Sequence, residues 1–248
     1  MHSLQTKLKS ALSIKHYTLR IVYCLLLLFA VLPIQAQDDP EYRMEMGDGI
    51  GVIGYLGDFN SKLTKNLQPM STIMARYNFN PYMGLKLNAS YGKIKGSSKD
   101  VKTYYPIYAE QPYTFNNQLV DVALTYEYNF WPYGTGRDYR GAQRLTPFVF
   151  GGLGVTYVKL KNSDKKNDFT ANVPIGLGLK YKVTERMNLG LEWAIHISMS
   201  DNLDGSKDPY GIKSEGMFKN TDCYHTLQLT LTYSFWAKCR TCHNQDED

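Results

Sequence analysis

A short cysteine motif near the end of the chain is the first pattern that could do chemistry. Cys239, Cys242 and His243 have the spacing C-x-x-C-H, which attaches c-type haem. Only five residues follow His243, so the tail cannot enclose a haem, and it offers three ligands where a closed zinc site needs four. We therefore expect no metal and no cofactor. The two thiols predict a disulfide, either with each other or with a partner protein.

A histidine and a serine two residues apart form the second pattern. His196-Ile197-Ser198 resembles the His-x-Ser element of outer-membrane lipid A deacylases, and Glu192 could supply the acid of a triad. In an extended strand, however, Glu192 and His196 lie about 13 Å apart, which excludes a direct hydrogen bond. We therefore expect that the protein is not an enzyme, and a lipid-modifying hydrolase is kept as the alternative.

Closely spaced glycines form the third pattern. Gly49, Gly51 and Gly54 match the dinucleotide fingerprint G-x-G-x-x-G, which requires a following helix and a crossover to a parallel strand. The next residues, Tyr55-Leu56-Gly57-Asp58, have no helical period. We therefore interpret these glycines as positions of close packing inside a β-barrel.

Most of the chain that must position these residues alternates between apolar and polar residues with a period of two. In residues 224–236, the odd positions 227–235 are Leu, Leu, Leu, Tyr and Phe, and the even positions 226–234 are Thr, Gln, Thr, Thr and Ser. Successive side chains of a β-strand point to opposite faces, so one face is apolar and the other is polar and uncharged. A strand of this length exceeds the usual ~5–6 residues. It suffices to cross a bilayer at a tilt, which takes roughly 9–11 residues.

Seven further segments repeat this alternation. They are residues 42–54, 71–79, 83–92, 117–130, 146–160, 171–181 and 187–199. Loop-like segments separate them, including the long stretches 94–114 and 201–222 and the short turns 80–82 and 183–186. Eight strands with alternately long and short connections predict an all-β fold, an eight-stranded antiparallel transmembrane β-barrel with long extracellular loops.

A soluble eight-stranded barrel of the lipocalin kind, with its apolar face inward, is the competing interpretation. Its outer face would be rich in Lys and Glu, whereas the polar positions of these segments are mostly Gly, Ala, Ser, Thr and Asn. Small side chains are what the narrow interior of an eight-stranded barrel can hold. The pattern therefore favours a barrel whose apolar face meets outer-membrane lipid.

The polar face also carries residues of both charges. They are Arg43, Arg76, Lys86 and Lys180, with Glu45, Asp121, Glu127 and Glu192. Because an unpaired buried charge is costly, we expect these residues to form a paired charge network in the lumen. Such a network predicts a plugged interior, and a selective pore or general small porin is the alternative.

The first 36 residues have the organisation of a cleaved signal peptide. Four basic residues precede an apolar run, residues 21–32, that is too short to span a membrane and ends at Ile34-Gln35-Ala36. We therefore divide the chain into a signal peptide (1–36), an outer-membrane barrel (37–236) and a periplasmic tail (237–248). Cleavage removes four of the 28 Lys and Arg residues and leaves 24 against 23 Asp and Glu. This balance gives no support to nucleic-acid binding.

Several longer segments resemble the PorG-type outer-membrane barrels of the type IX secretion system. They are EYRMEMGDGIGVIGYLGDFN (41–60), NPYMGLKLNASYGKI (80–94), NFWPYGTG (129–136), LTPFVFGGLGVTY (145–157) and the final strand. The resemblance covers nearly all of the mature chain. It implies a non-enzymatic anchor in the cell outer membrane that tethers a periplasmic ring made of PorK and PorN. The tail departs from the usual pattern, in which a barrel ends on its terminal aromatic residue, here Phe235 or Trp236.

An even number of strands puts both termini on the periplasmic side, where the turns should be short. Residues 131–144 are an exception, because this turn is long and rich in residue types favoured at protein interfaces. We therefore predict that this turn and the tail bind the ring. The predicted partner-binding residues are Trp131, Tyr133, Arg137, Tyr139 and Arg140, with Cys239 or Cys242 available for an intermolecular disulfide.

Overall fold

The computed structural model describes residues 42–57, 60, 62–100, 113–134, 142–160, 167–199, 203 and 222–237. The predicted signal peptide and the tail beyond Ala237 lie outside these residues. Within the described part of the chain, no helix has the length and hydrophobicity needed to cross a membrane.

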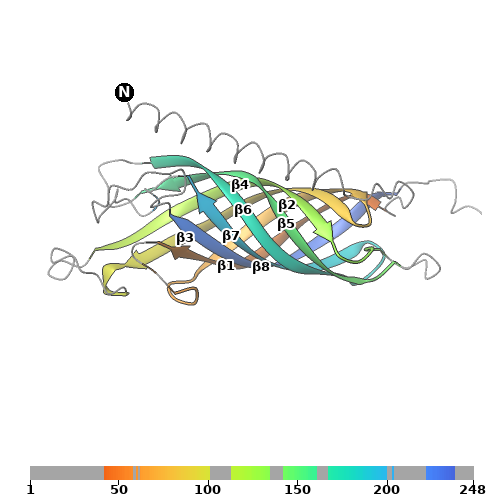
Figure 1. Cartoon of the computed structure of the whole chain (residues 1–248), viewed down its shortest axis with the longest axis horizontal. Helices are drawn as coiled ribbons and strands as arrows, with labels where there is room; N and C mark the ends of the chain where they lie inside the picture. Colours follow the sequence, from red (N-terminus) through yellow and green to blue (C-terminus); the bar gives the residue numbers. More distant parts are fainter. Residues whose placement is uncertain are drawn as a thin grey trace, which may run out of the picture. The chain divides into compact units, whose positions relative to one another are not determined.

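Eight antiparallel strands form one closed barrel (Figure 1). The strands are β1 (Tyr42–Leu56), β2 (Gln68–Asn80), β3 (Met83–Ser97), β4 (Thr114–Asn129), β5 (Leu145–Lys159), β6 (Asn167–Lys182), β7 (Met187–Ser198) and β8 (Cys223–Ala237). Each strand pairs with its neighbours in sequence, and β8 pairs with β1 to close the sheet. A closed sheet has no unpaired edge, as a sheet in lipid requires. The predicted fold class is confirmed.

The exterior of the barrel is an apolar belt. Leu87, Leu124 and Leu153 lie side by side on β3, β4 and β5 and are 49%, 47% and 69% exposed. Further along the same strands, Tyr91, Val120 and Tyr157 form another exposed row. Exposed apolar surface of this extent, with aromatic residues toward its edge, is the lipid-facing surface of a membrane barrel. The soluble alternative, with the apolar face inward, is wrong.

Glycines on β6 let aromatic side chains lie across the narrow interior. A Cβ atom at Gly178 would stand 2.7 Å from the Phe148 ring, and Gly176 is similarly crowded by Phe150. The two phenylalanines stack on each other, with their ring centroids 5.7 Å apart. Small residues on one strand therefore make room for rings on the next, which fills the lumen.

The strand ends differ from the prediction. The segment from residue 94 was expected to be loop, but β3 continues to Ser97. Strand β6 begins at Asn167, four residues before the predicted segment 171–181. In this part of β3 the chemistry of the two faces inverts, because Ile94 is buried inside while Lys93 and Lys95 are exposed outside. This end of β3 lies beyond the lipid-facing belt, so its outward side chains are no longer apolar and the alternation does not identify it as a strand.

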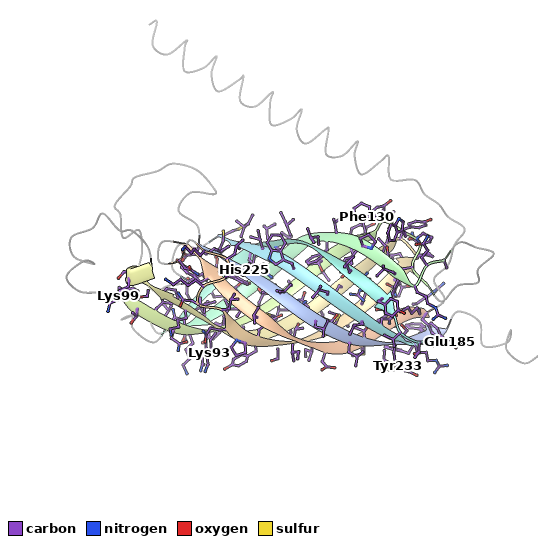
Figure 2. The ribbon with its side chains drawn as sticks, turned by 90° about the horizontal axis from the view of Figure 1, so that it is seen from below. Lys93, Lys99, Phe130, Glu185, His225 and Tyr233 are labelled. Atoms are coloured by element: carbon purple, nitrogen blue, oxygen red, sulfur yellow. The ribbon has the colours of Figure 1, made fainter. Side chains whose placement is uncertain are left out.

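The two ends of the barrel are distinct. We call the end where β1 begins and β8 finishes the terminal rim; it also carries the β2–β3, β4–β5 and β6–β7 turns. The opposite end, with the other connections, is the loop rim. In Figure 2, Phe130, Glu185 and Tyr233 lie toward the terminal rim, whereas Lys93 and Lys99 lie toward the loop rim.

Candidate functional site: the closed lumen and the terminal rim

Six buried charges meet inside the barrel, and we call them the charge network. They are Glu45, Arg76, Lys86, Glu127, Lys180 and Glu192, and each side chain is at most 4% exposed. Arg76 lies 2.6 Å from Glu45 and 2.7 Å from Glu127. The network holds three positive and three negative groups, so its net charge is zero. Neutrality and close pairing offset the cost of removing these groups from water.

Three members of the network, Glu45, Glu192 and Lys180, also have neutral hydrogen-bond partners. The Gln228 amide donates to Glu192 at 2.7 Å, and the Asn78 amide donates to Glu45 at 2.8 Å. The Lys180 ammonium donates to the Asn129 side-chain oxygen at 3.0 Å and lies 4.3 Å from the Phe148 ring centroid. Together with the ion pairs, these contacts fill the middle of the lumen with paired polar groups.

Two of the eight predicted network residues lie elsewhere. Arg43 is half-buried and makes no ion pair with any described residue. It stands at the terminal rim, where its neighbour across the β1–β8 junction, Trp236, has a φ of 65° and the regular pairing is interrupted. Asp121 is buried on β4, six residues from Glu127, which places it about 20 Å away along the strand.

Asp121 belongs to a separate hydrogen-bonded cluster nearer the loop rim. One of its carboxylate oxygens, Oδ1, accepts hydrogen bonds from Tyr224 at 2.7 Å, Thr156 at 3.0 Å and Asn172 at 2.5 Å. The His196 ring stacks on Tyr224, with the centroids 4.4 Å apart. His196 Nδ1 lies 3.8 Å from the second carboxylate oxygen, too far for a hydrogen bond.

The residues of the alternative hydrolase triad do not come together in the structure. Glu192 is held by Lys86 and Gln228, while the Ser198 hydroxyl lies 3.4 Å from the Thr170 hydroxyl. His196 is buried at 6% exposure and faces Asp121 instead. All three side chains point into the lumen, away from the lipid that a lipid-modifying enzyme would have to reach.

An apolar cluster closes the lumen toward the loop rim. Its members, which we call the loop-rim cluster, are Ile53, Tyr55, Met70, Ile94, Phe115, Leu119, Val158, Leu160, Leu203 and Tyr224. Leu203 comes from the β7–β8 connection and is held by two backbone contacts. Its N–H donates to Asp222 at 2.9 Å, and its carbonyl accepts from Asn117 at 3.0 Å. Asp222 also accepts a hydrogen bond from Tyr55. The β7–β8 connection therefore places the Leu203 side chain inside the barrel, where it packs in the loop-rim cluster.

The β4–β5 turn closes the terminal mouth. Tyr133 is 8% exposed, and its hydroxyl donates to the Asn188 side chain at 3.0 Å. Lys182 lies between two rings, 5.6 Å from the Tyr42 centroid and 5.5 Å from that of Tyr133. The cavities at the mouth and near His196 are each about 10 Å³, which is room for about one water.

The predicted partner-binding residues have different positions. Trp131 is exposed at the terminal rim, 44% of its surface being accessible. Tyr133 was expected at the interface, but it is turned into the mouth because the base of the turn folds back through hydrogen bonds to Pro81 and Gln143. It is therefore a plug residue. Arg137, Tyr139, Arg140, Cys239 and Cys242 lie outside the described residues.

Sequence reasoning did not predict that Leu203, Tyr133 and Tyr224 close the lumen. Leu203 stands between polar neighbours in a long connection, and Tyr133 sits in a turn, so neither belongs to an alternating pattern. Tyr224 was assigned to the end of a strand without a role. Its even position, on the face shared by Thr226 and Gln228, was the signal that could have placed it inside.

Known structures with a similar architecture share little sequence with this chain. The N-terminal β-barrel domain of Pseudomonas aeruginosa OprF is 18% identical, with a TM-score of 0.40 and coverage of 77% of this chain and 98% of that one. Neisserial surface protein A is 13% identical, with a TM-score of 0.45 and coverage of 77% and 96%. Pseudomonas aeruginosa OprG is 12% identical, with a TM-score of 0.42 and coverage of 81% and 99%. The chain has no match among curated proteins.

One family model matches most of the chain, residues 19–244, and its description is "Domain of unknown function (DUF6089)". The location of the protein follows from its own geometry. A closed eight-stranded barrel with an apolar exterior spans the outer membrane, and β1 begins at the same rim where β8 ends.

Proposed function

We propose that this chain, which belongs to the DUF6089 family, is a non-enzymatic outer-membrane component of the type IX secretion system. In this proposal the barrel anchors the periplasmic ring of PorK and PorN to the outer membrane. The terminal rim and the C-terminal tail make the contact.

The observation that carries the proposal is the closed interior. The charge network fills the middle of the barrel, the loop-rim cluster fills one end and Tyr133 fills the other. A pore needs a continuous polar path, and an enzyme needs a pocket that admits its substrate. The described residues provide neither, which favours a role carried out at a surface.

The terminal rim supports a role in protein binding. Trp131 is exposed, yet its backbone is fixed, because its N–H and its carbonyl both bond the Thr146 hydroxyl at 3.1 Å. The N–H of the neighbouring Phe130 donates to the Pro147 carbonyl at 3.0 Å. An exposed tryptophan on a fixed backbone is the kind of residue that dominates protein interfaces. The resemblance to PorG-type barrels supplies the identity of the proposed partner.

The test is recovery of the ring with the barrel. Trp131→Ala should lower the amount of PorK and PorN that co-purifies from solubilised outer membranes at least tenfold, because loss of an interface hot spot costs about 2 kcal/mol or more. Phe169→Ala is the matched control, since Phe169 is an exposed aromatic residue of the lipid-facing surface near the loop rim. Unchanged recovery with Trp131→Ala, or equal loss with Phe169→Ala, would contradict docking at this rim.

The tail and the catalytic alternative are tested with two further pairs of substitutions. Cys239→Ser with Cys242→Ser should remove any disulfide-linked partner seen under non-reducing conditions. His196→Ala with Ser198→Ala should leave secretion intact while the barrel stays folded. Lost lipid modification in the second variant would favour the hydrolase instead.

A further inference from the structure

The exterior of the barrel carries a basic row just beyond the edge of the apolar belt. Lys93 on β3 pairs in register with Gln118 on β4, which pairs with Lys159 on β5. Both lysines are exposed, and Gln118 is half-buried. We call these three residues the basic row. Two strand spacings separate the lysine backbones, about 10 Å, so one anionic group can be reached by both side chains.

The position of the basic row relative to the belt is well defined. The next outward row toward the middle of the barrel is Tyr91, Val120 and Tyr157, two residues away on each strand. Two residues correspond to about 7 Å along a strand. Aromatic residues mark the boundary of the hydrocarbon in membrane barrels, so the basic row lies at the level of the lipid headgroups. Figure 2 shows Lys93 on the outside of the barrel toward the loop rim.

The outward-facing charged residues described around the row are all positive. Going outward, the next exposed pair is Lys95 and Asn116, and the neighbour of Lys159 on β6 is Asn167. Among the described residues, no acidic side chain points outward on these ends of β3, β4, β5 and β6. Asp168 is adjacent in sequence, but it pairs with the fully buried Val158 and so lies on the inward face.

We propose that the basic row binds the phosphate groups of phosphorylated lipids in the leaflet at the loop rim. The lysine stems lie along the apolar surface while their ammonium groups reach the headgroup layer, and the Gln118 amide donates between them. Phosphate is the chemistry that two cations and an amide at this depth recognise. A lipid is favoured over a soluble anion because the row borders the lipid-facing belt directly. The binding is independent of the proposed docking at the other rim.

The experiment measures lipid retained by the purified full-length protein in detergent. Bisphosphorylated lipid A is titrated and bound copies are counted by native mass spectrometry. Lys93→Gln with Lys159→Gln should weaken binding roughly ten- to thirty-fold, the effect expected for two interfacial lysines. Lys93→Arg with Lys159→Arg should retain binding. The matched control, Lys62→Gln with Lys65→Gln, removes two exposed charges from the β1–β2 connection and should change binding less than twofold.

Each other outcome overturns the proposal. Wild-type affinity in the glutamine variant shows that the row binds no lipid phosphate, and equal weakening in the control shows a general charge effect. Binding of inorganic polyphosphate with no preference for lipid A would assign the row to a soluble anion. Folding is verified for every variant by the temperature-dependent gel mobility of the barrel. If the double variant does not fold, each single substitution is expected to weaken binding three- to five-fold.

Discussion

At the scale of single residues, Glu127 has the most demanding position in the lumen. Its carboxylate lies 2.7 Å from Arg76, 3.0 Å from Lys86 and 2.6 Å from Lys180. All four side chains are removed from water, so each depends on the others for stabilisation. Removal of one member of such a network leaves its partners charged, buried and incompletely paired.

The first prediction concerns this carboxylate. Glu127→Gln should lower the free energy of unfolding by about 3–5 kcal/mol, because three cations would lose their shared counter-ion. Denaturant titration in detergent, followed by circular dichroism, measures the change. Glu185→Gln is the control: this exposed residue lies in the turn at the terminal rim, and its substitution should change stability by less than about 0.5 kcal/mol. Equal stability of the two variants would contradict a structural network.

The membership of the network was only partly predictable. Alternation along each strand places Arg43, Glu45, Asp121 and Glu127 on the polar face. The structure shows that Glu45 and Glu127 join the charge network, where both pair with Arg76. Alternation predicts which side of the sheet a side chain points to, but not which residues of other strands lie at the same level along the barrel. That level depends on the register between neighbouring strands, which pairs Glu45 with Arg76 and leaves Arg43 at the rim. A single sequence contains no direct signal for that register.

At the scale of elements, the β4–β5 turn is the clearest departure from expectation. Its length and aromatic residues indicated an interface, but its base turns inward, so that Tyr133 fills the mouth. Burial raises the pKa of the Tyr133 hydroxyl above its ordinary range. Because this tyrosine stays protonated in the folded protein, its contribution to stability is complete below the ordinary tyrosine pKa of about 10.

The second prediction is therefore a pH dependence. Above about pH 10 the unfolded chain releases the Tyr133 proton and the folded chain keeps it, so this residue makes stability fall by up to about 1.4 kcal/mol per pH unit. Tyr133→Phe should be less stable than the wild type at pH 8 by about 1 kcal/mol, since it lacks the bond to Asn188. The difference should shrink as the pH rises through 11. A constant difference across this range would show that Tyr133 ionises normally.

The strands themselves were predicted wherever one face meets lipid. The alternation of β7 and β8 identifies them without ambiguity, because apolar and polar residues never exchange sides in the middle of either strand. The outer part of β3 was missed for the opposite reason. There Lys93 and Lys95 face water while Ile94 joins the loop-rim cluster, so the inward face becomes apolar.

At the scale of the whole molecule, the interior is closed at three successive depths. The third prediction is that the purified protein gives no measurable ion conductance in planar bilayers. Phe148→Ala with Phe150→Ala should remain closed as well, because the loop-rim cluster and Tyr133 still fill the two ends. A selective conductance of the wild-type protein would mean that the charge network lines an ion pathway through the barrel. It would favour the porin alternative.

The distribution of the six network charges along the chain also bears on how the barrel enters the membrane. The hairpin of β1 and β2 carries Glu45 directly opposite Arg76, and that of β3 and β4 carries Lys86 and Glu127. The β5–β6 hairpin carries one network charge, Lys180, and the β7–β8 hairpin carries one of opposite sign, Glu192. The network charges of the two early hairpins are therefore matched within each hairpin. We expect the β5–β6 and β7–β8 hairpins to insert together, because either hairpin alone would carry an unpaired network charge into the membrane.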